Sequence, residues 1–245
     1  MSVGRALLDL VLPVRCAGCD RAPGPWCALC LTATARLQRR PALAVAPDPC
    51  PPGFPPTWAA TTYDGPVRQA IVAHKDGGRH DLCDALGAWW RQAVAGALEA
   101  DEGLRAELVA RGRLVVVPVP SSRRSRRERG RDPWREVTER ALADRQEARV
   151  APVLQQVRGV ADQAGLGAAA RWDNLQGAIR VRPGADVRGR PCLLSDDVLT
   201  TGATLSECAR ALRVAGAAHV VAAVLAATPR APRRTRGRAA QGRLP

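Results

Sequence analysis

The sequence predicts an α/β fold, in which a parallel sheet is flanked by helices and preceded by a small cysteine-rich module. Short apolar runs typical of buried strands alternate with segments of helical periodicity over residues 57–228. Such alternation favours a parallel sheet with right-handed crossovers. Ahead of this region, two C-x2-C pairs are separated by seven residues, which is a spacing typical of small zinc-binding modules.

Hydrophobic spacing predicts each element in turn. The continuous apolar run Leu114–Val119 is typical of a strand buried on both faces, and Gly216 is the expected end of the last helix. The expected elements are, in chain order, a strand over Trp58–Asp64, helices from about Pro66 and over Leu82–Leu98, the strand Leu114–Val119, a helix bearing Trp134, Val137, Ala141 and Leu142, a weak strand over Pro152–Val157, a strand over Leu193–Asp196, a helix over Leu205–Ala215 and a last strand over Val220–Leu225.

We expect three parts in the chain. Residues 1–56 hold a zinc-knuckle module with a short leading helix, followed by a stiff linker whose run from Ala46 to Pro56 contains six prolines. Residues 57–228 form the α/β domain. Residues 229–245 carry six arginines and no acid, so we expect a disordered basic tail. The net charge of +14 falls to +8 without this tail, and such a surface suits polyanions, including nucleic acid.

Apolar segments and cysteines indicate the cellular compartment. The longest apolar run, near Val220–Ala227, is too short to span a bilayer. No small-residue cleavage site follows the stretch Ala6–Val14. We therefore expect a cytoplasmic protein without membrane insertion, whose cysteines are metal ligands or free thiols rather than disulfides.

Four cysteines near the N-terminus have the spacing of a structural zinc site. Cys16 and Cys19 form one pair, and Cys27 and Cys30 form the other. Together they supply four thiolates for tetrahedral Zn²⁺, which leaves no open position for catalysis. A redox role is the alternative, although it needs only one pair. The other cysteines have no partner at ligand spacing: Cys50, Cys83, Cys192 and Cys208.

The most informative segment runs from Leu193 to Thr204. An apolar strand ends in Asp196 and Asp197, and a turn rich in hydroxyls leads into a helix. Carboxylates accept hydrogen bonds from a sugar diol, and the N–H groups at a helix N-terminus hold a phosphate. The alternative is an ordinary solvated turn after a buried strand.

This segment resembles the phosphoribosyl-diphosphate (PRPP) motif of type I phosphoribosyltransferases. The resemblance implies a sheet of that type and a site in which Asp196 and Asp197, the candidate catalytic residues, hold the ribose hydroxyls. Five residues would wrap the 5′-phosphate: Thr200, Thr201, Gly202, Ala203 and Thr204.

PRPP also requires a second anion site, and the segment after the strand Leu114–Val119 is the candidate. Six arginines and one glutamate lie between Ser121 and Arg131. Arginine forks match phosphate oxygens, and with Mg²⁺ they would stabilise departing pyrophosphate. The alternative is a solvated basic loop or a nucleic-acid patch. The candidate pyrophosphate ligands are Arg123, Arg124, Arg127 and Arg129.

A third segment, residues 163–179, places Gln163, Arg171 and Asn174 among small residues, as an ordinary amphipathic helix also would. The chain carries, in order, the four-cysteine knuckle, a Tyr-Asp-Gly-Pro segment, a His-Lys pair, a Pro-Val-Pro strand end, this segment and the PRPP motif. In this order the chain resembles the ComF family of amidophosphoribosyltransferase-like competence proteins over roughly residues 5–228.

The ComF resemblance implies further roles. Gln163, Arg171 and Asn174 would belong to a hood that excludes water from the reacting centre. Lys75, the only lysine, would lie near the site and assist pyrophosphate binding, although a surface charge after a helix is the alternative. The resemblance also implies a competence context, with incoming single-stranded DNA and competence-machinery proteins as partners.

Two functions follow from these observations. The first is a phosphoribosyltransferase that transfers phosphoribose from PRPP to a nitrogen acceptor and releases pyrophosphate. The second is a non-catalytic module that binds nucleic acid or senses PRPP and assists single-stranded DNA uptake during natural transformation. The scarcity of aromatic residues, at 3%, argues against a dedicated platform for stacking single-stranded bases.

Overall fold

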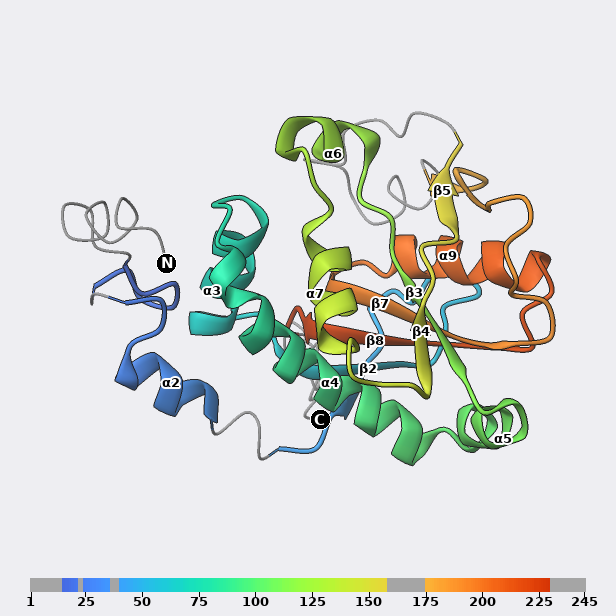
Figure 1. Ribbon diagram of the computed structural model, residues 1–245, viewed down its shortest axis with the longest axis horizontal. Coiled ribbons are helices and arrows are strands. Elements are labelled where there is room, and N and C mark those ends of the chain that lie inside the picture. Colours follow the sequence, from blue (N-terminus) through green and yellow to red (C-terminus); the bar gives the residue numbers. More distant parts are fainter. Residues whose placement is uncertain (1–14, 22–23, 36–39, 158–174, 230–245) are drawn as a thin grey trace, which may run out of the picture.

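The parallel sheet predicted from the sequence is confirmed by the computed structural model, which describes residues 15–21, 24–35, 40–157 and 175–229 (Figure 1). The main sheet has the strand order β1-β2-β8-β7-β3-β4. Only β1 runs antiparallel to its neighbour. Its strands are β1 (Leu43–Ala44), β2 (Thr57–Thr62), β3 (Leu114–Pro118), β4 (Ala148–Val150), β7 (Pro191–Leu199) and β8 (His219–Ala227).

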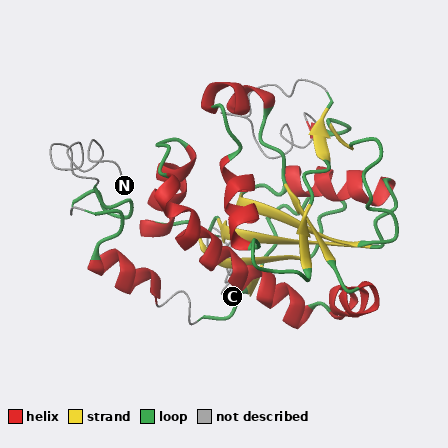
Figure 2. Ribbon diagram, in the orientation of Figure 1, coloured by secondary structure: helices red, strands yellow, loops and turns green. Residues whose placement is uncertain are grey.

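Helices cover both faces of this sheet, as Figure 2 shows. Helices α3, α4, α5 and α7 share one hydrophobic core with one face, whereas α9 shares a second core with the other face. The helical segments are α2 (Ala28–Ala35), α3 (Gly65–Lys75), the short 3₁₀ turn η2 (His80–Leu82), α4 (Cys83–Ala100), α5 (Glu102–Arg111), α6 (Arg123–Arg129), α7 (Pro133–Ala141) and α9 (Ala203–Val214).

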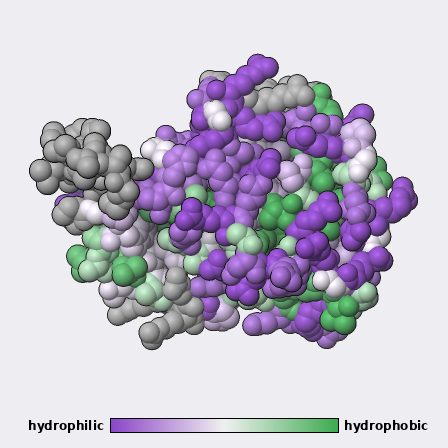
Figure 3. Space-filling model, in the orientation of Figure 1, coloured by the Kyte–Doolittle hydropathy of each residue, from purple (hydrophilic) through white to green (hydrophobic). Residues whose placement is uncertain are grey.

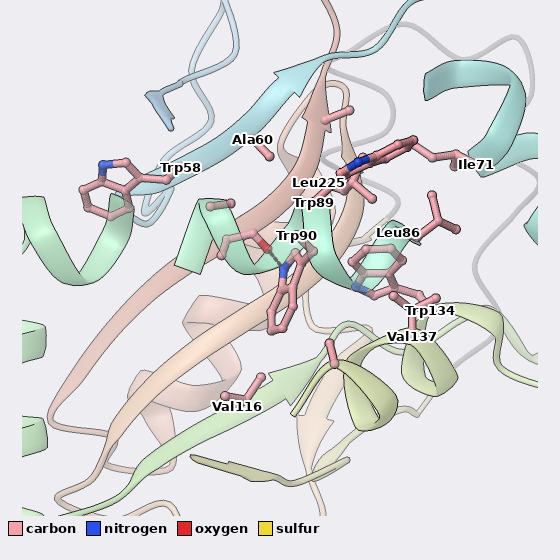
Figure 4. Close-up of a cluster of buried hydrophobic side chains, with 14 of the residues drawn as sticks. Trp58, Ala60, Ile71, Leu86, Trp89, Trp90, Val116, Trp134, Val137 and Leu225 are labelled. Carbon is pink, nitrogen blue, oxygen red and sulfur yellow. Dashed lines mark hydrogen bonds between the residues drawn. The ribbon is translucent and has the colours of Figure 1, made fainter. Parts of the chain in front are cut away.

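The continuous apolar strands serve two cores at once. In β3, Val116 points into the core beneath α4, while Val115 and Val117 point into the core beneath α9. This alternation follows from the two-residue period of a strand, and it explains why the run has no polar positions. In the first core, Trp90 donates its indole N–H to the Ala223 carbonyl at 2.9 Å (Figure 4).

The structure corrects several boundaries expected from the sequence. Strand β7 does not end at Asp196 but continues to Leu199, because its pairing with β8 extends through Ala227. The weak strand expected near Pro152 is β5 (Leu154–Gln156), but it pairs antiparallel with β6 (Ile179–Val181) outside the main sheet. The basic segment after β3 is a helix rather than a loop, since the Ser122 side chain caps α6 by accepting from the Ser125 N–H.

Some expectations concern residues that lie outside the described ranges. These are the leading helix, the proposed hood residues and the basic tail. Among the helices that the structure describes, none combines the length and apolar character needed to cross a membrane. Hydrophilic side chains dominate the view in Figure 3, and hydrophobic surface gathers over α2 at its left, where Leu29 and Leu31 are exposed.

Candidate functional site

A cavity of about 470 Å³ opens at the carboxyl ends of β3 and β7. Parallel α/β sheets bind their ligands at this edge. The cavity joins the acidic segment, the start of α9, the end of α3 and the segment around α6. The residues that line the cavity include Tyr63, Ile71, Lys75, Asp76, Ser121, Ser122, Ser125, Arg129, Trp134, Asp196, Asp197, Thr200 and Thr204.

The two adjacent acids form one wall of the cavity. Asp197 is buried, and its backbone N–H donates to the Asp196 carboxylate at 2.9 Å. Burial raises the pKa of Asp196 to about 8, and repulsion by Asp197 adds to the shift while Lys75 opposes it. Because both carboxylates are poorly solvated, the wall favours a ligand that brings positive charge or hydrogen-bond donors.

Lys75 is the counter-ion of this wall. Its Nζ atom donates to Asp197 Oδ2 at 2.7 Å, across 122 residues of sequence. Burial alone would lower the pKa of Lys75, but attraction to Asp197 and the hydrogen bond between them raise it overall. The structure therefore places Lys75 near the site, as the ComF resemblance implies, but its partner is Asp197 of the acidic wall.

The phosphate-binding turn predicted from the sequence leads directly into α9. Thr200 and Thr204 line the cavity, and Gly202 caps the helix with a φ of 73°, which is a left-handed conformation that glycine adopts most readily. A Cβ at this position would lie 2.8 Å from ring carbons of both Phe54 and Pro47. The proline-rich segment thus packs onto this turn, and only glycine fits beneath it.

The basic end of the cavity differs from the prediction. Arg129 lines the cavity, and its Nη2 atom donates to Asp76 Oδ1 at 2.7 Å. Arg127 is exposed and is not among the lining residues. Arg123 and Arg124 begin α6, but their side chains lie outside what the structure describes.

Three serine hydroxyls that the sequence analysis did not select lie at this same end. Ser121, Ser122 and Ser125 line the cavity. The Ser122 hydroxyl lies 2.8 Å from the Ser125 hydroxyl, and Ser121 donates to Asp132 Oδ1 at 2.9 Å. The signal was present as Ser-Ser-x-x-Ser after a buried strand, which is a helix-capping pattern as well as a set of donors for phosphate.

An aromatic side chain was also missed. Trp134 lines the cavity, and its indole N–H donates to Ser195 Oγ at 2.9 Å. The same hydroxyl lies 2.9 Å from Thr138 Oγ1. This buried polar cluster ties α7 to β7 immediately before the acids, and it gives Ser195 a role that an apolar residue could not fill.

The proposed hood residues Gln163, Arg171 and Asn174 lie outside the described residues. The described residues stop at Val157 and resume at Leu175. These two ends are held near each other, because the Val157 N–H donates to the Ala178 carbonyl at 2.9 Å.

The four N-terminal cysteines converge as the spacing predicts. Their Sγ atoms all lie within 4.8 Å of one another. Backbone N–H groups of Cys27 and Gly18 donate to Cys16 Sγ at 3.2 and 3.4 Å. Burial raises the pKa of the Cys16 thiol, but these backbone hydrogen bonds outweigh it and lower the pKa to about 6. A four-sulfur cluster with a stabilised thiolate fits a structural zinc ion.

A second group of metal-type donors is better explained without a metal. His74, Cys83 and Glu136 place one donor atom each within 4.8 Å of one another. Both ring nitrogens of His74 already face carbonyl oxygens, that of Arg79 at 2.8 Å and that of Pro133 at 3.2 Å. This buried histidine therefore links the end of α3 to the start of α7.

The remaining cysteines divide by burial. Cys192 and Cys208 are fully buried in the core beneath α9, as the sequence predicts for small apolar filler. Cys50 is exposed.

Comparison with known families supports the type of fold. The family model of the phosphoribosyl transferase domain matches residues 123–242. This range contains both acids, the turn predicted to bind phosphate and α9, and the match supports the type I phosphoribosyltransferase superfamily for this part of the chain. No curated protein matches the chain.

Proposed function

We propose that the protein binds PRPP together with Mg²⁺ and transfers its phosphoribosyl group to a nitrogen nucleophile, releasing pyrophosphate. The main support for this proposal is that three groups of residues suited to different parts of PRPP line one cavity of about 470 Å³. The acids suit a ribose diol, the start of α9 suits the 5′-phosphate, and Arg129 with three serines suits pyrophosphate.

The chemistry requires positioning and charge stabilisation more than a strong base. The bond from the ribose C1 atom to pyrophosphate breaks, and pyrophosphate takes the bonding electrons. The nucleophilic nitrogen forms a bond to C1 and releases its proton to solvent. Arg129 and the serine hydroxyls are placed to hold the leaving oxygens, and Asp196 and Asp197 to fix the ribose. Bound Mg²⁺ would neutralise charge on the diphosphate.

The apolar part of the cavity lining offers a surface for the acceptor. Tyr63 and Ile71 line it together with Trp134. Aromatic and aliphatic groups of this kind cover the flat, apolar parts of a ligand. We therefore expect an acceptor with a planar ring beside its nucleophilic nitrogen.

Release of pyrophosphate tests the catalytic proposal. The zinc-loaded protein is incubated with PRPP, Mg²⁺ and a panel of nucleobases and amines, and pyrophosphate is measured by a coupled assay. We expect release with a planar nitrogen acceptor and at least about a tenfold loss in Arg129→Met, since a charge-assisted contact to the leaving group is removed. Arg135→Met, which removes an exposed i,i+4 partner of Glu139, is the matched control. Absence of release with every acceptor would contradict catalysis.

The ComF assignment is part of this proposal and rests on the order of motifs in the chain. It brings the expectation of a cytoplasmic protein acting beside the DNA-uptake machinery. Exposed Arg127 on α6 favours an additional contact with a nucleic-acid backbone. Retention of single-stranded DNA should then weaken steeply with salt, and no retention at low salt would dismiss this role.

A further inference from the structure

The cysteine knuckle packs directly against the part of the α/β domain that begins α3 and α4. The Trp26 ring meets the Trp89 ring of α4 edge-on, with centroids 5.5 Å apart. A Cβ on Gly18, between the first two cysteines, would lie 2.7 Å from Cys30 Sγ and 3.1 Å from the Pro66 Cβ at the start of α3. The contact with Cys30 leaves no room for a side chain, and the same turn of the knuckle packs closely against the start of α3.

One guanidinium joins the two halves of the knuckle to the turn after α3. Arg79 donates through Nη1 to the Arg15 carbonyl at 2.8 Å and through Nη2 to the Pro25 carbonyl at 3.3 Å. Asp81 fixes the same guanidinium with two hydrogen bonds of 2.8 and 2.7 Å. Each carbonyl lies within two residues of a knuckle cysteine, so Arg79 contacts backbone whose path the metal-binding cysteines set.

The backbone of Arg79 continues this connection to the cavity. Its carbonyl accepts from His74 Nδ1 at 2.8 Å, and its N–H donates to the Ala73 carbonyl at 3.2 Å. His74 directly precedes Lys75, whose Nζ atom lies 2.7 Å from Asp197 Oδ2. Arg79 is therefore one anchor of the end of α3 that presents Lys75 to the acids, and Pro133 and Arg131 hold the same end through His74.

We propose that Arg79 is a positioning residue that couples metal binding in the cysteine knuckle to PRPP binding in the cavity. The inference rests on the proposed function. A metal ion held by four thiolates fixes the knuckle carbonyls to which Arg79 donates, and Arg79 in turn fixes Lys75. Coupling between two binding equilibria is reciprocal. Zinc therefore raises the affinity for PRPP, and PRPP raises the affinity for zinc by the same factor, which we expect to be about tenfold.

Two titrations on the full-length protein test this coupling. Calorimetry measures PRPP binding with Mg²⁺ to zinc-loaded and chelator-treated protein. Competition with a chromophoric chelator measures zinc affinity with and without PRPP. Arg79→Met keeps the apolar stem and the backbone carbonyl but removes the guanidinium. Arg111→Met, which removes an exposed partner of Glu107 on α5, is the matched control.

We expect equal coupling factors of about ten in the wild type and in Arg111→Met. In Arg79→Met both ligands should still bind, but each without effect on the other. Hydrogen exchange over residues 73–79 should accelerate when zinc is removed from the wild type, while protection of β7 and β8 persists and shows that the sheet remains folded. This readout reports the position of α3 without any ligand in the cavity.

The outcomes separate this inference from the proposed function. Equal PRPP affinity with and without zinc in the wild type would overturn the coupling and leave the PRPP site intact. A coupling factor unchanged in Arg79→Met would overturn the role of Arg79. Failure of the zinc-loaded wild type to bind PRPP at all would overturn the proposed function and the coupling together.

Discussion

The two ends of the cavity were predictable from the sequence to very different degrees. At the acidic end, two carboxylates and the following turn lie on consecutive residues from Asp196 to Thr204, and the backbone places them together. At the basic end, Arg129 and three serines come from the region of α6, where many arginines look alike in sequence. Consecutive residues define their own geometry, whereas the choice among six arginines depends on which face of a short helix meets the cavity.

The largest expected loss of PRPP affinity follows from a substitution in the turn after the two acids. Gly202→Ala forces an alanine into a left-handed conformation and places its Cβ 2.8 Å from Phe54 and Pro47. Because small misplacements of a binding group can cost about 100-fold, we expect PRPP affinity to fall by about that factor in calorimetry. Gly189→Ala, at a φ of 63° with no atom nearer than 3.5 Å, is the control. Equal losses in both variants would assign the effect to general strain.

The raised pKa of Asp196 predicts how the stability of the protein depends on pH. Its pKa is raised from 3.8 to about 8 by burial first and by Asp197 second. Between these values the folded state holds a proton that the unfolded state has released, so stability without ligand should fall as pH rises from about 4 to about 8.

The same shift predicts how ligand binding depends on pH. Binding of PRPP with Mg²⁺ needs the ionised carboxylate, so its affinity should rise by up to about tenfold per pH unit below pH 8. Calorimetry between pH 6.5 and 9 checks this dependence, with Asp196→Asn as the variant in which it should flatten. An equally steep profile in Asp196→Asn would assign the titration to another group.

The basic end is tested by two arginines of the same helix. Arg129 lines the cavity, while Arg127 is exposed outside it. Arg129→Met should weaken pyrophosphate binding about tenfold, whereas Arg127→Met should change it less than about twofold, because a charge-assisted contact is lost only in the first. Pyrophosphate titration of the two variants makes the comparison directly. The reverse order would mean that α6 presents a different face to the ligand.

The smallest expected effect is on the free energy of unfolding, through the hydrogen bond between Trp134 and Ser195 next to the acids. Trp134→Phe removes the indole N–H that donates to Ser195 Oγ and leaves Thr138 as the partner of that hydroxyl. The loss of one buried hydrogen bond should lower the free energy of unfolding by about 1 kcal/mol. Denaturant unfolding measures it, with Trp58→Phe, whose ring belongs to the same core, as the matched indole control. An unchanged midpoint in Trp134→Phe would contradict the role given to this bond.

The fold followed from the sequence where apolar runs are long. The runs that became β3, β7 and β8 face two cores, and no other packing suits them. The strands β1, β4 and β6 have two or three residues each, too few to show a periodicity, and tertiary pairing alone defines them. Arg-rich α6 was expected as a loop because its sequence lacks an apolar face, although its Ser122 cap was visible.

Site residues that are close together in the sequence were likewise predicted better than those brought together by the fold. Adjacent residues and regular cysteine spacing predicted that the acids and the following turn lie at one cavity and that the four cysteines converge. The contact between Lys75 and Asp197 spans 122 residues. The family resemblance placed Lys75 near the site as a pyrophosphate ligand, and nothing in the sequence predicted this contact. Trp134 and the serines gave no signal that separates a site residue from a core residue or a helix cap.

The most direct test of the central claim is calorimetric titration of PRPP into the zinc-loaded protein, with and without Mg²⁺, beside an Asp196→Asn/Asp197→Asn double variant. Asp186→Asn, whose carboxylate is exposed and paired with Arg190, is the matched control. The account predicts Mg²⁺-dependent binding in the wild type and the control, and its loss in the double variant. Binding that is absent from the wild type, or that persists unchanged in the double variant, would contradict the assignment of this cavity as a PRPP site.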